Sequence, residues 1–439
     1  MNDFPSSRFD RGKLMAKAGI KVGGNYAKYH LKKALRRNGN DAEAKRELHR
    51  SSASELFSEF SKLRGTALKL AQGLSLDSAI MPEEFAEVMT QAQYSVPPIS
   101  RILVNRIIKN ELGDLPESLF EEFSPEAVAA ASLGQVHRAT GKNGEQLAVK
   151  VQYPNLRETI DSDISMARLI FDRIVKSPKA DEYFAEVRNK LMEETDYQNE
   201  GRQISDFHAR YSSDRFATPE WRPDLSTERV LTMTWLQGRH LNEFLKSNPT
   251  QEERNHFGQL MWDFFHEQIN DSYTVHADAH PGNFLLLDDG RLGVLDFGCV
   301  KVCPEDFFKN YMRLFLAHRD QDREEMIALY KKLEILEKRP EEDDEERAFY
   351  EYTLELGKYF VSPYKHDFFD FGDDQFRTKF NGFARDSMQF REPRGSRHFI
   401  FVARAHLGLY QMLMKIRAKV DVRPGRKRLY EFLEAQELV

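Results

Sequence analysis

The chain has 439 residues, 41% of them hydrophobic, and its 64 Lys and Arg against 70 Asp and Glu give a formal net charge of −6. This length allows two or three domains with well-filled cores, which excludes a mainly disordered or fibrous protein. The near-balance of charge argues against a dedicated nucleic-acid-binding protein, so we expect no nucleic acid among its partners. Two cysteines, Cys299 and Cys303, cannot form a disulfide framework, and a reducing compartment is expected.

The first 50 residues are the most basic part of the chain, with 13 Lys and Arg, 5 Asp and Glu and a local charge of +8. Residues 11–37 hold nine basic residues and no acidic one, interleaved with apolar residues. This pattern indicates a basic amphipathic helix, which either lies on an anionic membrane surface or packs as a solvated helix against the acidic remainder. No secretory signal is visible, so we expect a cytoplasmic protein, peripheral at the membrane if residues 11–37 supply the contact.

Helices are expected next. Ser52 and Glu55 form a capping pattern that predicts a helix beginning at Ser52. Further helical patterns cover residues 82–94 and 100–112, and Gly113 ends the second of them.

After these helices the sequence pattern changes to short strand-like runs. Residues 121–150 alternate such runs with turns, and Asn143-Gly144 is a strong hairpin signal, so a small antiparallel sheet is predicted. A helical region over 156–210 and another strand over 229–235 follow.

The remainder is expected to be mainly helical, interrupted by a second hairpin. Residues 284–287 and 292–295 form its strands around Asp288-Asp289-Gly290. Residues 399–416 are the most apolar stretch, but they contain Arg404, His406 and Lys415 and therefore indicate a buried helix rather than a membrane span. The acidic cluster 341–346 is expected to be a solvated loop.

Residues 129–136 stand between two strand-like runs at the position of a kinase glycine-rich loop. Alanines replace the first two glycines, and only Gly134 remains, although glycine makes close backbone approach to phosphates inexpensive. The strand that follows carries Ala148-Val149-Lys150, the pattern that places an ammonium against α- and β-phosphates. The predicted nucleotide-binding residues are Ala129, Ala130, Ala131, Ser132, Gly134, Val136, Ala148 and Lys150.

The lysine needs a carboxylate partner. We predict Glu200 for this role, with Glu193 and Glu194 as competitors.

Two later motifs have the spacing of phosphotransferase catalytic loops. Asp278 and Asn283 form Asp-x-x-x-x-Asn, in which Asp278 would orient an attacking hydroxyl and Asn283 would hold a metal ion. Asp296 begins Asp-Phe-Gly, and its carboxylate suits Mg²⁺. The hairpin between Asp278 and Asp296 allows these residues to converge. ATP or ADP with Mg²⁺ is therefore the predicted cofactor set.

Taken together, these motifs resemble the UbiB-type, AarF-like atypical kinases of the protein-kinase-like superfamily, over about residues 51–302. The marks of that family are Lys69-Leu-Ala-Gln72, Ser132-Leu-Gly-Gln-Val-His137, Ala148-Val-Lys-Val-Gln-Tyr-Pro154, Glu194-Thr-Asp196 and His276-Ala-Asp-Ala-His-Pro-Gly-Asn-Phe284.

The resemblance implies an α+β, bilobal protein-kinase-like fold, with a small antiparallel β-sheet N-lobe, a mainly helical C-lobe and an N-terminal helical extension. The predicted division is a basic segment (1–50), the helical extension (51–118), the N-lobe (119–236) and the C-lobe (237–439).

The resemblance also assigns an occluding role to the extension. Lys69 and Gln72 would reach Glu194 and Asp196, where a peptide substrate would otherwise bind. Protein phosphorylation in trans is then disfavoured, and ATPase activity or phosphorylation of a small-molecule or lipid-like substrate in support of ubiquinone biosynthesis is favoured, with quinone-biosynthesis proteins as partners.

Two positions depart from the family pattern. Ala71 stands where the family has glycine. Thr234 stands in the hinge where an acidic residue is frequent, and backbone groups of Trp235 and Leu236 would still bind adenine.

Two rival functions stay open. His276, Asp278 and His280 alternate as ligands of a metal-dependent hydrolase would, with Asp296 as a further ligand. A non-catalytic nucleotide-binding scaffold would explain the lost loop glycines and the occluding extension.

Overall fold

The computed structural model describes residues 8–35, 41–63, 98–131, 133–174, 180–270, 273–276, 281–295, 300–386, 390 and 394–435. The chain divides into two compact units. Unit 1 comprises Met1–Ser205 and Glu220–Trp235, and unit 2 comprises Asp206–Pro219 and Leu236–Val439.

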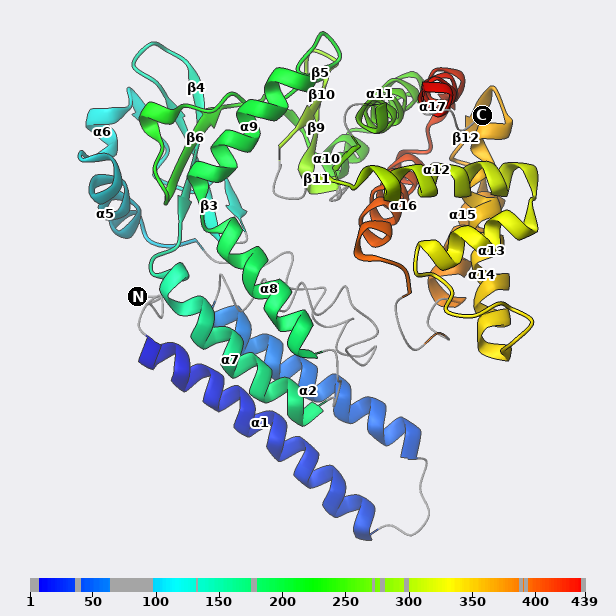
Figure 1. Cartoon of the computed structure of the whole chain (residues 1–439). Helices are drawn as coiled ribbons and strands as arrows, with labels where there is room; N and C mark the ends of the chain where they lie inside the picture. The colour runs from blue at the N-terminus through cyan, green and yellow to red at the C-terminus, as the bar shows by residue number, and fades with distance from the viewer. Residues whose placement is uncertain are drawn as a thin grey trace. The chain divides into compact units, whose positions relative to one another are not determined.

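Unit 1 contains an antiparallel sheet of order β1-β3-β4-β6, with β2 paired to β3. Figure 1 labels its strands β3, β4 and β6. The predicted first hairpin is confirmed: Gly144 has φ +80° in the turn, and Gly141 N donates to Glu145 O over 2.8 Å. The strands are β1 (Glu122–Phe123), β2 (Ala129–Ala131), β3 (Gly134–Thr140), β4 (Gln146–Gln152) and β6 (Val230–Thr234).

Several helices of unit 1 pack on one another and share one hydrophobic core with this sheet. Gly113, with φ +87°, ends α5 as predicted, because a left-handed C-cap favours glycine. The predicted helix start at Ser52 is wrong: α2 already begins at Asp41, and Ser52 is a buried residue inside it. The helices are α1 (Arg8–Leu35), α2 (Asp41–Leu63), α5 (Arg101–Leu112), α6 (Pro116–Leu119), α7 (Leu156–Ile174), α8 (Ala180–Glu194) and α9 (Tyr197–Tyr211), with a 3₁₀ turn, η2 (Pro223–Leu225); α9 continues beyond Ser205 into unit 2.

The basic helix α1 has one face packed within its own chain. Ala18 and Val22 are fully buried in the core of unit 1, which α2 also enters through Ala53. Lys21 Nζ binds Glu55 of α2 at 2.5 Å. The face of α1 that carries Ala18 and Val22 therefore packs against the chain, which was one of the two alternatives for residues 11–37. Contact with a membrane would have to use the exposed face of α1.

Unit 2 contains a second sheet, of order β5-β10-β9-β7. The predicted second hairpin is confirmed as β9 and β10, with Gly290 at φ +88° in its turn. Strand β5 lies parallel to β10, whereas the other pairs in this sheet are antiparallel. The strands are β5 (Phe216–Ala217), β7 (Gly238–Arg239), β9 (Phe284–Leu287) and β10 (Leu292–Val294), with two further pairs, β8 (Thr274–His276) with β11 (Val300–Val302) and β12 (Phe368–Asp370) with β13 (Lys419–Asp421).

The rest of unit 2 is helical, as predicted. Residues 399–416 lie in α16, and no helix in the described part of the chain is long and apolar enough to cross a bilayer. The helices are α10 (Leu241–Lys246), α11 (Gln251–Asn270), α12 (Glu305–Asp320), α13 (Arg323–Lys332), α14 (Asp344–Val361), α15 (Asp374–Asp386), α16 (Arg397–Ile416) and α17 (Arg423–Ala435), with 3₁₀ turns η3 (Pro281–Asn283) and η4 (Pro363–Lys365).

The acidic cluster 341–346 is not simply a loop, as the sequence had suggested. Asp343 caps α14 through Glu345 N and Glu346 N, and the following acidic residues occupy the first turn. Carboxylates are favourable there because the helix N-terminus carries partial positive charge. Glu346 is buried and bound by Arg394 at 2.5 Å.

Candidate active site

One face of the unit 1 sheet gathers several predicted nucleotide-binding residues. Across the β3–β4 ladder, Val136 stands opposite Lys150 and Gly134 stands opposite Gln152. Directly opposed residues share a face, and so do alternate residues of one strand. Gly134, Val136, Ala148 and Lys150 therefore belong to one face of the sheet.

The ammonium of Lys150 is held by a carboxylate from α9. Lys150 Nζ donates to Glu200 Oε1 at 2.7 Å and to Oε2 at 2.9 Å. The two side chains are only 18% and 16% exposed, so the pair is shielded from much of the solvent that weakens surface ion pairs. The competitor Glu193 is exposed.

Tyr197 is a site residue that sequence reasoning missed. Lys150 Nζ lies 4.8 Å from the centroid of the Tyr197 ring, a cation–π distance. Tyr197 precedes Glu200 by three positions, so both side chains extend from the same face of α9. Burial raises the pKa of the Tyr197 hydroxyl far above its usual range, so the ring stays neutral. That i, i+3 spacing was the available signal.

Gly134 is needed for packing. A Cβ at this position would clash with Val151 O and would stand 2.9 Å from Tyr197 Oη. The glycine that remains in the alanine-rich loop is therefore explained by the close approach of β4 and Tyr197. Ala129 is exposed, Ser132 lies outside the described residues, and for Ala130 and Ala131 the structure describes the backbone in β2.

The Glu-x-Asp motif supports the start of α9. Asp196 Oδ1 accepts a hydrogen bond from Asn199 N at 2.9 Å, as an N-capping residue does. Thr195 O accepts from Gln152 Nε2 at 3.0 Å, which ties the turn to β4. Lys69, Ala71 and Gln72 lie outside the described residues, so their contact with Glu194 and Asp196 stays a prediction.

The predicted hinge has its own local bonds. Trp235 N donates to Gln146 O over 2.8 Å, so this N–H already has a partner within the protein. Thr234 N donates to Glu220 O, and Thr234 Oγ1 accepts from Glu220 N at 2.8 Å. This reciprocal pair gives the threonine a structural role at a position where an acidic residue is frequent in the family.

In unit 2, Asn283 ends η3, directly before β9. Asn283 O accepts a hydrogen bond from Leu295 N at 2.9 Å. The backbone of Asn283 is thus bonded to the residue that precedes Asp296. Asp278, His280, Asp296 and Cys299 lie outside the described residues. Amide and carboxylate oxygens such as those of Asn283 and Asp296 are the donors that Mg²⁺ prefers, so this donor set fits the metal.

His276 lies in the interior of unit 2. It is buried in β8, where its backbone N–H donates to Gln268 Oε1 at 2.6 Å. Its ring packs 5.8 Å from that of Phe284 and 6.4 Å from that of Phe207, between centroids. Within the described ranges no group of three or more His, Cys, Asp or Glu could hold a metal ion. Asp278, His280 and Asp296, the other ligands of the hydrolase alternative, lie outside the described residues, so that alternative stays open.

An antiparallel sheet carrying a lysine bound to a helical glutamate, followed by a helical unit with an asparagine at the foot of a hairpin, defines a protein-kinase-like α+β fold. Comparison with known proteins agrees. Residues 91–330 match the model of the ABC1 atypical kinase-like domain. The chain is 30% identical over 346 residues to Atypical kinase COQ8, mitochondrial, of Saccharomyces cerevisiae. The aligned region covers 76% of this chain and 67% of that protein.

Two further comparisons extend this result. AarF domain-containing protein kinase 1 of Xenopus laevis is 31% identical over 291 residues, covering 64% of this chain and 56% of that protein. The structure of Rv3197 from Mycobacterium tuberculosis, solved as a complex with erythromycin, aligns with a TM-score of 0.62 at 25% identity and covers 88% of this chain and 97% of that one. The chain belongs to the ABC1, or UbiB and AarF-like, family of atypical kinases, as its motifs indicated.

Proposed function

We propose that the protein binds ATP with Mg²⁺ and either hydrolyses it or transfers its terminal phosphoryl group to a small-molecule or lipid-like acceptor. The observation that carries this proposal is the bond of Lys150 Nζ to both oxygens of Glu200. A lysine held in this way on the sheet face is positioned to neutralise the α- and β-phosphates, as in protein kinases. Membership of the atypical kinase family supports the same chemistry.

The residues of unit 1 would bind the nucleotide. Val136 and Ala148 share the sheet face with Lys150 and would pack against the base or ribose. Tyr197 and Glu200 would keep the ammonium in place while phosphates bind, which reduces the reorganisation that binding requires. Because Trp235 N–H donates to Gln146, the N–H of Leu236 is the proposed donor to adenine.

The residues of unit 2 would act on the phosphates and the acceptor. Asn283 and Asp296 would hold Mg²⁺, which when bound offsets the negative charge of the phosphate oxygens. Asp278 would orient the acceptor, a hydroxyl or a water, and accept its proton. A positioned base of this kind contributes about 10² to 10⁴ in rate.

The acceptor class follows from the proposed extension contacts and from the relatives. Lys69 and Gln72, held by Glu194 and Asp196, would cover the place where a peptide would bind, and this favours ATPase activity or a small or lipid-like acceptor.

We propose a role in ubiquinone or related isoprenoid quinone biosynthesis, with quinone-biosynthesis proteins as partners, a cytoplasmic location and peripheral contact with an anionic membrane. The chain spans 67% of yeast COQ8 and 62% of the Dictyostelium discoideum kinase abkA. The four-part division of the chain (1–50, 51–118, 119–236 and 237–439) is part of this proposal.

ATP turnover of the purified protein, with and without vesicles containing cardiolipin, tests the proposal. Asp296→Asn should abolish Mg²⁺-dependent turnover. Asp289→Asn is the matched control: Asp289 lies exposed in the hairpin turn, bound to Arg291, and this change should leave turnover intact. Nucleotide binding without turnover, even with vesicles present, would identify a scaffold instead. Stoichiometric bound zinc would favour the hydrolase.

A further inference from the structure

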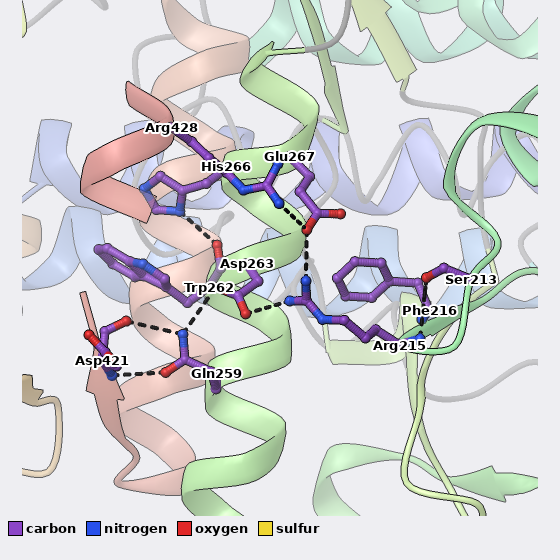
Figure 2. Close-up of polar contacts among 10 residues, drawn as sticks. All are labelled: Ser213, Arg215, Phe216, Gln259, Trp262, Asp263, His266, Glu267, Asp421 and Arg428. Carbon is purple, nitrogen blue, oxygen red and sulfur yellow. Dashed lines mark hydrogen bonds and ion pairs between the residues drawn. The ribbon is translucent and has the colours of Figure 1, made fainter. Parts of the chain in front are cut away.

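A cluster of four charged side chains joins three parts of unit 2 (Figure 2). Arg215, directly before β5, donates to Asp263 and to Glu267 of α11, the second at 2.9 Å. Arg428 of α17 donates to the same Glu267 oxygen at 3.1 Å. Two arginines thus meet two carboxylates, so their charges balance.

The carboxylates are well enclosed. The side chains of Asp263 and Glu267 are 13% and 21% exposed, against 36% for Arg215. Gln259 donates to Asp263 Oδ1 at 3.0 Å, and its own oxygen accepts from Asp421 N at 2.8 Å (Figure 2). Burial raises the pKa of Asp263, and the Gln259 bond and the Arg215 charge act against that shift. Loss of Arg215 would therefore leave enclosed carboxylates with less compensation.

The backbone of the same arginine is bonded to the hairpin. Arg215 O accepts from Leu292 N at 3.0 Å, and Phe216 pairs with Leu292 in the parallel β5–β10 ladder. Strand β10 then leads to Leu295, whose N–H is bonded to Asn283 O. Arg215 therefore connects α11, through its side chain, to the hairpin that begins after Asn283 and ends before Asp296.

Aromatic contacts reinforce this connection. The Arg215 guanidinium lies 4.9 Å from the centroid of the Phe216 ring. Phe216 packs edge to face on Phe264 of α11, with 5.4 Å between centroids, and Phe264 packs on Phe284 at 6.1 Å. Phe284 is the residue after Asn283, so α11 supports the hairpin through its apolar face as well as through its charges.

We propose that Arg215 is a positioning residue for the hairpin between the proposed metal ligands Asn283 and Asp296. It fixes β5, and through β5 the strand β10, against Asp263 and Glu267 of α11. The residue does not touch nucleotide or metal. Its effect on the metal rests on the proposed function of Asn283 and Asp296, whereas its effect on the hairpin itself does not.

Two measurements on Arg215→Gln test this inference. Hydrogen–deuterium exchange of peptides covering 284–295 should be faster than in the wild type. The Mg²⁺ concentration that half-saturates binding of a non-hydrolysable ATP analogue should rise by about 10-fold, the lower end of the effect of residues that orient metal ligands. Binding of the analogue without metal should change less than about 2-fold, because Lys150 in unit 1 is unaltered.

Two further variants complete the test. Arg313→Gln removes a comparable ion pair, with Glu325 between α12 and α13, and should change neither measurement. Arg215→Lys keeps the charge but reaches fewer oxygens and should fall between the wild type and Arg215→Gln. Exchange and Mg²⁺ dependence equal to the wild type in both Arg215 variants would overturn the inference. If the wild type bound the analogue independently of Mg²⁺, the proposed metal assignment would fail, while hydrogen exchange would still test the anchor.

Discussion

Lys150 Nζ lies 4.8 Å from the centroid of the Tyr197 ring, and Glu200, three residues further along α9, binds the same ammonium with both oxygens. The first turn of one helix thus holds the candidate phosphate-binding lysine through an aromatic face and a carboxylate. The cap of that helix is Asp196, in the Glu-x-Asp motif.

Removing the aromatic face should weaken nucleotide binding. Cation–π contacts contribute about 0.5 to 2 kcal/mol, so Tyr197→Leu should raise the dissociation constant for ATP by about 2- to 30-fold. Tyr197→Phe keeps the ring and should bind within about 2-fold of the wild type. Isothermal calorimetry checks both, with Phe383→Leu as control because Lys379 lies over that ring in unit 2. Equal binding by the two Tyr197 variants would refute a role for the ring.

Glu200→Gln should weaken the function of Lys150 more than the same change at a neighbouring carboxylate does. Hydrogen bonds to charged groups contribute about 1.5 to 3 kcal/mol, so nucleotide affinity or turnover should fall by about 10- to 150-fold. Glu193→Gln, seven residues earlier and exposed, should have no such effect. A comparable loss in both variants would show that Glu200 is not the functional partner.

Substitution of Gly134 should destabilise the protein. Gly134→Ala forces a Cβ against Val151 O, and overpacking of this kind costs about 1 to 3 kcal/mol. Gly24 in α1 has no atom within 4 Å of an added Cβ, so Gly24→Ala should stabilise by about 0.5 to 1 kcal/mol. Urea unfolding measures both. A neutral Gly134→Ala would mean that β4 does not approach the loop this closely.

Buried histidines of unit 2 should make the protein sensitive to acid. His266 donates from Nδ1 to Trp262 O at 2.7 Å and accepts from the Tyr364 hydroxyl at 2.8 Å. Burial lowers the pKa of His266 from 6.5 to about 4 and that of His406 to about 3. Because the unfolded histidines bind protons below pH 6.5 and the folded ones do not, this stability is present above pH 6.5 and is lost as the pH falls toward 4.

The free energy of unfolding should therefore decrease from pH 7 to pH 4.5, by up to about 1.4 kcal/mol per pH unit for each such histidine. Urea titrations at several pH values measure the slope. His266→Asn should reduce it, and His256→Gln, at an exposed position, should not. A slope unaffected by His266→Asn would contradict this assignment.

The sequence indicated the parts of the structure that depend on local chemistry. Both hairpins followed from turn residues that accept positive φ, at Gly144 and Gly290. The order of motifs predicted the kinase-like fold because each motif has a fixed place in it. The role of Tyr197 was missed, because its i, i+3 spacing from Glu200 places both residues on one face of α9 but does not show that this face meets Lys150 of β4.

The pairing of strands that are far apart in the chain could not be predicted from the sequence either. The segment Asp206–Pro219 joins unit 2 through the parallel pairing of β5 with β10, although it stands in the chain between segments of unit 1. Neither the pattern around Phe216 nor the charge of Arg215 specifies that partner strand. The start of α2 was missed because a Ser-x-x-Glu pattern inside a helix is indistinguishable from a capping box when packing is unknown.

The central proposal is that the nucleotide phosphates bind Lys150 while their metal ion binds Asn283 and Asp296. A crystal structure with ADP and Mn²⁺ tests it directly, because the anomalous signal of manganese locates the metal. We predict a peak within coordinating distance of the side-chain oxygens of Asn283 and Asp296, with a phosphate oxygen hydrogen-bonded to Lys150 Nζ. A nucleotide bound away from Lys150, or a metal bound by His276 and His280 instead, would contradict the account.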